Sequence, residues 1–188
     1  MFKIYEKDYK CLRFLESKAD ELLKFYLDTK PEEFEILAGW NVVTQYQYNS
    51  DTLIGINEIF DEAIEISKED GVFIAILSYS TIPVGNKTVF HTHTHTHPLF
   101  KRLHLNLQTN DDSYLEIYQN QIPWITGKTM VFENPNYVHR PVNNGITDRI
   151  NVIIDLYECK SVPDDEFNTY LNEIVGTKKE ELEKRGLI

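Results

Sequence analysis

The chain has 188 residues, which is enough for one domain with a sizeable core and too few for a second independent domain. Hydrophobic residues make up 41% of it and aromatic residues 12%, a composition typical of folded rather than disordered chains. The formal net charge of −11 repels phosphate backbones and anionic lipid surfaces, so we expect neither nucleic acid nor a membrane as a partner.

Residues 1–70 are predicted to form two helices and a strand that support the rest of the fold. In residues 8–27 apolar side chains recur at spacings of three and four, which predicts an amphipathic helix. Residues 41–48 alternate β-forming side chains with a period of two and predict a strand. A second helix is predicted to begin at an N-cap in Ser50-Asp51 and to end at Gly71.

Residues 71–157 have a different character, because β-branched and aromatic runs alternate there with Gly, Pro, Asn and Asp turns. The predicted strands are residues 72–77, 88–90, 103–107, 114–118, 129–132 and 150–156. Such regular short strands predict a closed β sandwich or barrel. Residues 158–188 are predicted to add a C-terminal helix and a charged tail. We therefore expect a mainly β fold with flanking helices, in a single domain over residues 1–188.

Histidine is concentrated in one segment of the chain. Five of the six histidines lie within fourteen residues, at positions 91, 93, 95, 97 and 104, and the sixth is His139. Because successive side chains of a strand point to opposite faces, the alternation with Thr puts the first four on one face. Neutral imidazole nitrogens are strong ligands for Fe, Zn, Ni or Cu. The segment therefore predicts a metal site, and the alternative is a solvated edge strand with adventitious metal affinity.

Further polar residues follow the histidines in a distinctive order. They are Arg102-Leu103-His104-Leu105-Asn106-Leu107, Trp124 to Gly127, Phe132, His139, Arg149 and Asp155. The series resembles the aspartyl/asparaginyl β-hydroxylase family, whose pattern has a metal-binding His, Arg-x-His-Leu-x-Leu, Trp-x-x-Gly ahead of a Phe, a second metal-binding His, and Arg followed by Asp. The intervals Trp124 to Gly127, Gly127 to Phe132, His139 to Arg149 and Arg149 to Asp155 are three, five, ten and six residues, as in the family.

The resemblance implies a non-haem Fe(II) dioxygenase on a double-stranded β-helix (jelly-roll) core, which uses 2-oxoglutarate (2OG) as cosubstrate to hydroxylate a C–H bond. It implies that His139 is a metal ligand and that Arg149 binds the distal carboxylate of 2OG. A guanidinium suits that role because its fork offers two parallel charge-assisted hydrogen bonds. Arg102 and His104 match additional 2OG contacts, and Ser80 matches a hydroxyl contact. The implied substrate is an amino acid, a peptide side chain or a small metabolite.

The identity of the first metal ligand stays open at this point. Counting back from His104 by the family interval selects His93, whereas counting forward from Gly85 selects His91, and His95 is a further candidate. His91 and His93 can also bind together, with the second imidazole in the place of the carboxylate that most iron oxygenases of this fold carry. No Asp or Glu occurs from Thr88 to Phe100.

The alternative function is a cupin-like metal-binding enzyme or module that does not use 2OG. Gly85 followed by His91-Thr92-His93, and His139 ahead of Asn143, are similar to the two halves of the cupin motif. The acid expected after the histidine pair is missing. Nothing in the cupin motif calls for Arg149, so replacing this arginine distinguishes the two functions.

The remaining features concern compartment, thiols and substrate. Charged residues from Lys3 onward, and the lack of any run of about 18 apolar residues, predict a cytoplasmic protein. Cys11 and Cys159 are too few and too far apart for a disulfide framework or a thiolate metal cage. Loops are expected to select the substrate. The candidates beside the motif are Trp124, Asn134, Asn136, Tyr137, Arg140 and Tyr157.

Overall fold

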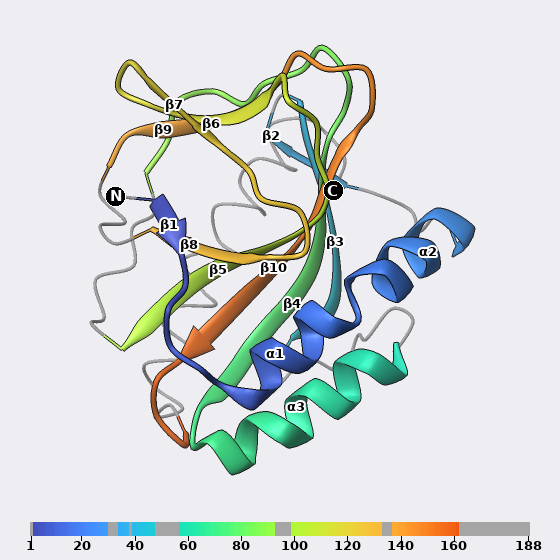
Figure 1. Cartoon of the computed structure of the whole chain (residues 1–188), viewed down its shortest axis with the longest axis vertical. Helices are drawn as coiled ribbons and strands as arrows, with labels where there is room; N and C mark the ends of the chain where they lie inside the picture. The colour runs from blue at the N-terminus through green and yellow to red at the C-terminus, as the bar shows by residue number, and fades with distance from the viewer. Residues whose placement is uncertain are drawn as a thin grey trace, which may run out of the picture.

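The computed structural model describes residues 2–29, 34–37, 39–47, 57–92, 99–132 and 137–161. Its helices are α1 (Lys10–Ser17), α2 (Ala19–Thr29) and α3 (Glu58–Asp70). One antiparallel sheet has the order β1-β8-β5-β10-β4-β3-β2, with bounds β1 (Phe2–Ile4), β2 (Phe34–Leu37), β3 (Trp40–Gln47), β4 (Phe73–Ile82), β5 (Phe100–Gln108), β8 (Thr129–Phe132) and β10 (Arg149–Tyr157). A smaller antiparallel sheet has the order β7-β6-β9, with bounds β6 (Ser113–Ile117), β7 (Asn120–Pro123) and β9 (His139–Asn143) (Figure 1).

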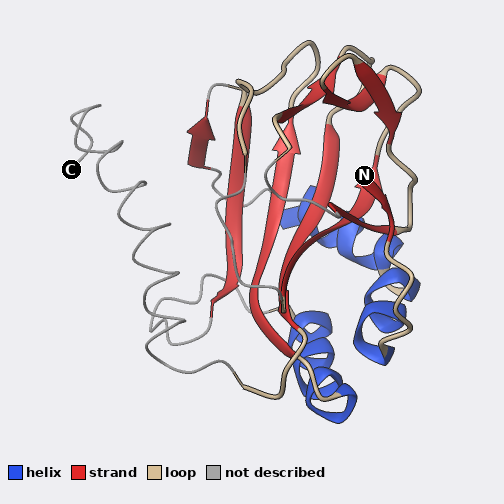
Figure 2. Ribbon diagram, turned by 90° about the vertical axis from the view of Figure 1, so that its left-hand side faces the viewer, coloured by secondary structure: helices blue, strands red, loops and turns tan. Residues whose placement is uncertain are grey.

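The large sheet buries one of its faces against the helices, which lie together on the same side of it (Figure 2). Side chains alternate between the two faces of a strand, and on β10 the alternate residues Val152 and Ile154 belong to the main apolar core. The helices contribute residues such as Leu12, Leu15 and Leu22, which are at most 1% exposed. Because each fully buried leucine contributes about 1.5–3 kcal/mol, this face supplies most of the apolar stabilisation.

The opposite face of the large sheet is polar. Arg149, Asn151 and Asp155 alternate with the apolar residues of β10, and each is at most 1% exposed. The neighbouring strand β5 adds Arg102, which is opposite Asp155 in the register, and His104. Buried polar groups require hydrogen-bond partners or a ligand. This buried polar face, on the side of the small sheet, is therefore the candidate position of a functional site.

The helices agree with the sequence in type but differ in their ends. α3 begins after Asn57, whose side-chain oxygen accepts a hydrogen bond of 3.0 Å from the N–H of Ile59, and it ends at Gly71 with a φ of 68°. It thus begins later than the predicted N-cap at Ser50-Asp51, which lies outside the described residues. The helix predicted over residues 8–27 is in fact two helices, because the chain leaves helical geometry at Lys18.

The strand prediction is wrong in one place that matters for the site. Residues 88–90 form no strand, and the chain around them makes only isolated bridges, between Lys87 and Val142 and between His91 and His139. Four short strands, β1, β2, β7 and β9, are absent from the prediction. The C-terminal helix predicted within residues 158–188 lies outside the described residues beyond Ser161, and a single domain over residues 1–188 stays a prediction. Among the described helices, none combines the length and apolar character of a membrane-spanning segment.

Candidate active site

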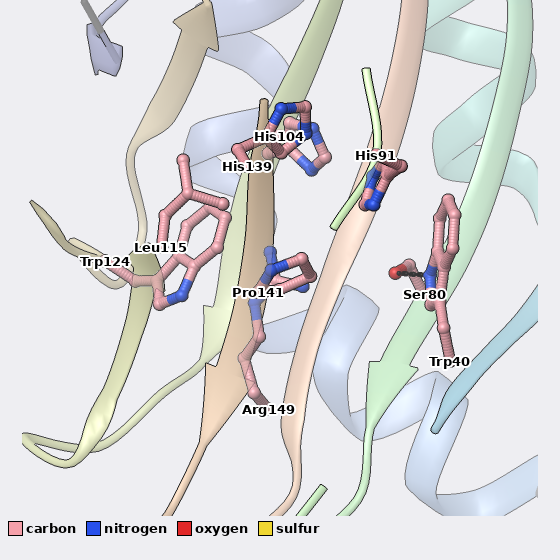
Figure 3. Close-up of a pocket in the computed structure, with 9 residues that line it drawn as sticks. All are labelled: Trp40, Ser80, His91, His104, Leu115, Trp124, His139, Pro141 and Arg149. Atoms are coloured by element: carbon pink, nitrogen blue, oxygen red, sulfur yellow. Dashed lines mark hydrogen bonds between the residues drawn. The ribbon is translucent and has the colours of Figure 1, made fainter. Parts of the chain in front are cut away.

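A pocket of about 320 Å³, part of it open to solvent, lies between the polar face of the large sheet and the small sheet (Figure 3). Strands of both sheets contribute to its wall. The lining residues are Trp40, Ser80, His91, His104, Leu115, Trp124, His139, Pro141 and Arg149. Five of the predicted site residues are in this set, which brings together parts of the chain that are far apart in sequence.

His91 and His139 are held opposite each other by two backbone hydrogen bonds. The N–H of His91 donates to the carbonyl of His139 at 2.9 Å, and the N–H of His139 donates to the carbonyl of His91 at 3.0 Å. Residues paired in this way point their side chains to the same face. Their ring centroids are 4.5 Å apart. Since metal–imidazole bonds measure about 2.0–2.1 Å, one ion can contact both rings at this separation.

Both imidazoles are in the tautomer that metal sites use. Nδ1 of His91 lies 3.0 Å from the carbonyl oxygen of Val89, and Nδ1 of His139 lies 2.7 Å from that of Tyr137. Because a carbonyl only accepts, each Nδ1 carries the proton and Nε2 is the unprotonated nitrogen, the form that a metal ion would need. Burial lowers the pKa of His139 to about 4 and also lowers the pKa of His91. Both rings are therefore neutral near pH 7.

Among the described residues, these two imidazoles are the candidate metal ligands that the structure brings together. Across the described ranges, no group of three or more His, Cys, Asp or Glu side chains is arranged to hold a metal ion. The predicted ligand His93 and the alternative His95 lie outside the described residues. The chemistry of the pair, two neutral nitrogen donors on adjacent backbone segments, suits a divalent transition metal.

Arg149 places a buried cation in the same pocket. Its side chain is 1% exposed, and burial lowers its pKa to about 9, so the guanidinium remains charged near pH 7. Its Nε and Nη2 have no hydrogen-bond partner among the described residues. Burying a charge without a partner is costly, and an anionic group of a ligand would offset that cost. The pocket is therefore suited to a carboxylate at Arg149.

Trp40 connects two of the predicted site residues. Sequence reasoning missed it, because its only signal is an aromatic side chain beside a predicted strand. Its indole N–H donates to Oγ of Ser80 at 2.7 Å, the bond drawn in Figure 3. Its ring stacks on that of His91, with centroids 5.9 Å apart and planes 16° apart. Because the Ser80 oxygen accepts from Trp40, the hydroxyl hydrogen of Ser80 can donate to a ligand in the pocket.

His104 and Arg102 occupy one face of β5 but have different surroundings. His104 lines the pocket, its Nδ1 lies 2.8 Å from Nδ2 of Asn151, and burial together with the charge of Arg149 holds its pKa well below the usual value. Arg102 is outside the lining set, and it donates from Nε and Nη2 to the two carboxylate oxygens of Asp155 at 2.8 and 2.7 Å. The motif aspartate thus balances Arg102, and the role of Arg102 as a 2OG contact stays a prediction.

The residues predicted to select the substrate do not gather at one place. Trp124 lines the pocket, whereas Tyr157 packs in a separate apolar cluster with Phe100. Arg140 follows His139 on β9, so its side chain lies on the other face of that strand, where it pairs with Glu116 at 2.8 Å. Asn134 and Asn136 lie outside the described residues. Of this group, Trp124 alone is part of the pocket wall that the structure describes.

Comparison with known proteins bears out the resemblance seen in the sequence. The model of a family described as aspartyl/asparaginyl beta-hydroxylase matches residues 20–158. Among curated protein sequences, none matches this chain. The family match covers every described residue of the pocket wall.

Several solved structures have a similar fold at low sequence identity. A viral collagen prolyl hydroxylase from Paramecium bursaria Chlorella virus-1, in complex with 2OG, is 12% identical with a TM-score of 0.52, over 82% of this chain and 96% of that one. A prolyl-4-hydroxylase from Pseudomonas putida is 11% identical with a TM-score of 0.53, over 83% and 91%. A 2OG-Fe(II) oxygenase family member from Burkholderia pseudomallei is 10% identical with a TM-score of 0.52, over 85% and 96%. These similarities confirm the predicted jelly-roll fold.

Proposed function

The chain belongs to the aspartyl/asparaginyl β-hydroxylase family, and on this premise we propose that it is an Fe(II)- and 2OG-dependent dioxygenase that hydroxylates a C–H bond of its substrate. The observation that carries the proposal is the presence, in one pocket, of two neutral imidazoles and a buried guanidinium whose Nε and Nη2 have no partner among the described residues. A transition metal satisfies the first feature and a carboxylate satisfies the second. 2OG carries both a metal-chelating 2-oxo acid and a distal carboxylate.

We propose that His91 and His139 hold the iron through Nε2, with His93 as the further predicted ligand. When bound, Fe(II) supplies the redox chemistry by which O₂ oxidises 2OG to succinate and CO₂ and places one oxygen atom in a C–H bond. The chain keeps its two imidazoles neutral and fixed by the Val89 and Tyr137 carbonyls. Arg149 then orients 2OG by binding its distal carboxylate.

Further contacts to 2OG are assigned to residues beside this framework. Ser80 and His104 line the pocket and are proposed to donate to or accept from the cosubstrate. Arg102 is proposed to contact 2OG from its position beside His104, with its orientation set by Asp155. The substrate is proposed to be an amino acid, a peptide side chain or a small metabolite.

The proposal is tested with untagged protein that is loaded anaerobically with Fe(II) and titrated with 2OG. We expect the visible absorption band of a chelated Fe(II)–2-oxo acid complex. His139→Asn should abolish the band, because it removes one ligand while keeping an N–H donor for the Tyr137 carbonyl. Arg149→Met should retain iron but weaken 2OG binding by roughly 100-fold or more, as expected for the loss of hydrogen bonds to a charged group.

Arg140→Met is the matched control, because it removes a guanidinium from the other face of β9 and should leave 2OG binding unchanged. A band that survives in His139→Asn would contradict the metal assignment. Stoichiometric iron without any 2OG-dependent band would contradict the dioxygenase proposal and would favour a cupin-like metal protein. Under that alternative, Arg149→Met has little effect on any bound ligand.

A further inference from the structure

Trp124 presents an unused hydrogen-bond donor to the pocket. The residue is 6% exposed and lines the pocket wall, and its Nε1 has no hydrogen-bond partner among the described residues. A buried indole N–H usually finds a partner, because leaving it unsatisfied costs about 1–3 kcal/mol. In contrast, the indole N–H of Trp40 in the same pocket is already bonded to Ser80. The Trp124 donor therefore indicates a ligand acceptor at this point of the wall.

The same tryptophan supports the buried guanidinium of Arg149. Cζ of Arg149 lies over the Trp124 ring, 3.7 Å from its centroid, so the guanidinium contacts the face of the indole. The N–H groups of a guanidinium lie in its own plane, and an anion must therefore approach along its edge. Figure 3 shows Trp124 and Arg149 together in the wall of the same pocket. The unpartnered donors of the two residues thus belong to the same pocket wall.

The position of Trp124 is itself fixed by the fold. Phe2 on β1 packs against the indole edge to face, with ring centroids 5.0 Å apart and planes 80° apart. The turn after Trp124 is closed by Gly127, which has a φ of 72° and donates from its N–H to the carbonyl of Asn106 at 2.7 Å. The Phe2 contact and the Gly127 turn therefore both help to set the position of the indole.

We infer that Trp124 is part of the subsite for the distal carboxylate of 2OG, its ring face supporting the Arg149 guanidinium and its indole N–H donating to the same carboxylate. This inference rests on the proposed function, because it takes 2OG as the ligand. The indole N–H of Trp124 adds a neutral donor to the charged donors of Arg149. This donor recognises a carboxylate but gives no advantage to a methyl group. Trp124 should therefore contribute to the choice of 2OG over 2-oxo acids that lack the second carboxylate.

The test compares 2OG with 2-oxopentanoate, which has the same chain length and a methyl group in place of the distal carboxylate. Dissociation constants are measured anaerobically by calorimetry on the Fe(II)-loaded full chain. Trp124→Phe keeps an aromatic face and removes the N–H, so the Kd for 2OG should rise roughly tenfold or more. The Kd for 2-oxopentanoate should not change. Ile125→Ala, at a residue 41% exposed in the same loop, is the control and should leave both constants unchanged.

The outcomes separate this inference from the proposed function. If the iron-loaded wild type binds neither 2-oxo acid, the dioxygenase proposal fails and the subsite fails with it. If the wild type prefers 2OG and Trp124→Phe retains that preference in full, only the role of Trp124 is overturned. An equal loss for both ligands would also overturn it, because the effect would then arise at the metal end of the pocket or from the fold.

A second measurement needs no substitution of Trp124. The chain has two tryptophans, Trp40 and Trp124, so Trp40→Phe leaves Trp124 as the sole indole fluorophore. Adding 2OG to this protein should change the Trp124 emission, because a hydrogen bond to the indole N–H alters its surroundings, whereas 2-oxopentanoate should cause a much smaller change. Identical responses to the two ligands at saturation would overturn the assignment of the N–H to the distal carboxylate.

Discussion

Acidification should destabilise the metal-free protein, in part because the fold holds the His139 imidazole in its neutral form. This imidazole is 2% exposed, and burial lowers its pKa from the ordinary 6.5 to about 4. Above pH 6.5 neither the folded nor the unfolded chain binds a proton at this residue, so its contribution to stability is fully present. As the pH falls below 6.5, the unfolded chain takes up a proton that the folded chain excludes, and the free energy of unfolding decreases until about pH 4.

The magnitude follows from the interval between the two pKa values. One pH unit corresponds to about 1.4 kcal/mol for a single group, so His139 should account for a loss of about 3 kcal/mol between pH 6.5 and pH 4. The pKa values of His91 and His104 are also lowered, and these residues add losses of the same sign. A domain of this size is stable by about 5–15 kcal/mol, so a loss of this size is readily measured.

The assay is urea unfolding of metal-free protein at several pH values from 7.5 to about 4.5. His139→Asn removes the titrating group and keeps a donor for the Tyr137 carbonyl, so its free energy of unfolding should fall less steeply with decreasing pH than that of the wild type. Thr92→Ser, beside His91, is a control that should keep the wild-type slope. Parallel slopes for His139→Asn and the wild type would refute the claim that His139 is held neutral by burial.

Two further predictions concern the polar face of the large sheet and the wall of the pocket. Asp155→Asn should lower the free energy of unfolding by about 2 kcal/mol or more, because it leaves the Arg102 charge without its carboxylate; this value is discounted because Arg102 is 16% exposed. The double variant Arg102→Met/Asp155→Leu should recover much of that loss, because it removes both charges. Chemical denaturation of the two variants measures the difference, and a double variant no more stable than Asp155→Asn would contradict this account of the pair. Trp40→Phe should keep an aromatic ring beside His91 but lose the bond to Ser80, which lowers the affinity for 2OG roughly 3- to 10-fold. Calorimetry should show an unchanged affinity for Fe(II), and a large loss of iron binding would mean that Trp40 acts on the metal ligand instead.

Local patterns predicted the regular elements well where their period was clear. The β-branched run at residues 150–156 predicted β10, because such side chains fit a strand that is buried on both faces. The helical spacing in residues 8–27 predicted an amphipathic surface that the large sheet now covers. Short strands were missed because their sequences contain polar residues or proline, as β9 does at Pro141. Their pairing comes from neighbouring strands rather than from their own propensity.

For the candidate site too, some residues were predicted from the sequence and others were placed only by the structure. Family spacing identified His139, Arg149 and His104, since these residues lie within one continuous pattern of the chain. The spacing could not choose between His91 and His93, because the two directions of counting differ by two residues. The structure places His91 opposite His139 through two backbone hydrogen bonds, and His93 lies outside the described residues.

The sequence by itself thus determined the family and the kinds of ligand that its polar residues suit, because residue types and their spacing limit which ligands a metal or a carboxylate can find. Only the tertiary structure decided how those residues meet. It brought Trp40 of β3 against His91 and Ser80, left Arg149 buried on the face of Trp124, and gave Arg102 the carboxylate of Asp155 as its partner. The physical reason is that the periodicity of a sequence specifies on which face of a strand a side chain lies, whereas the order of strands in a sheet specifies which other side chains lie beside it.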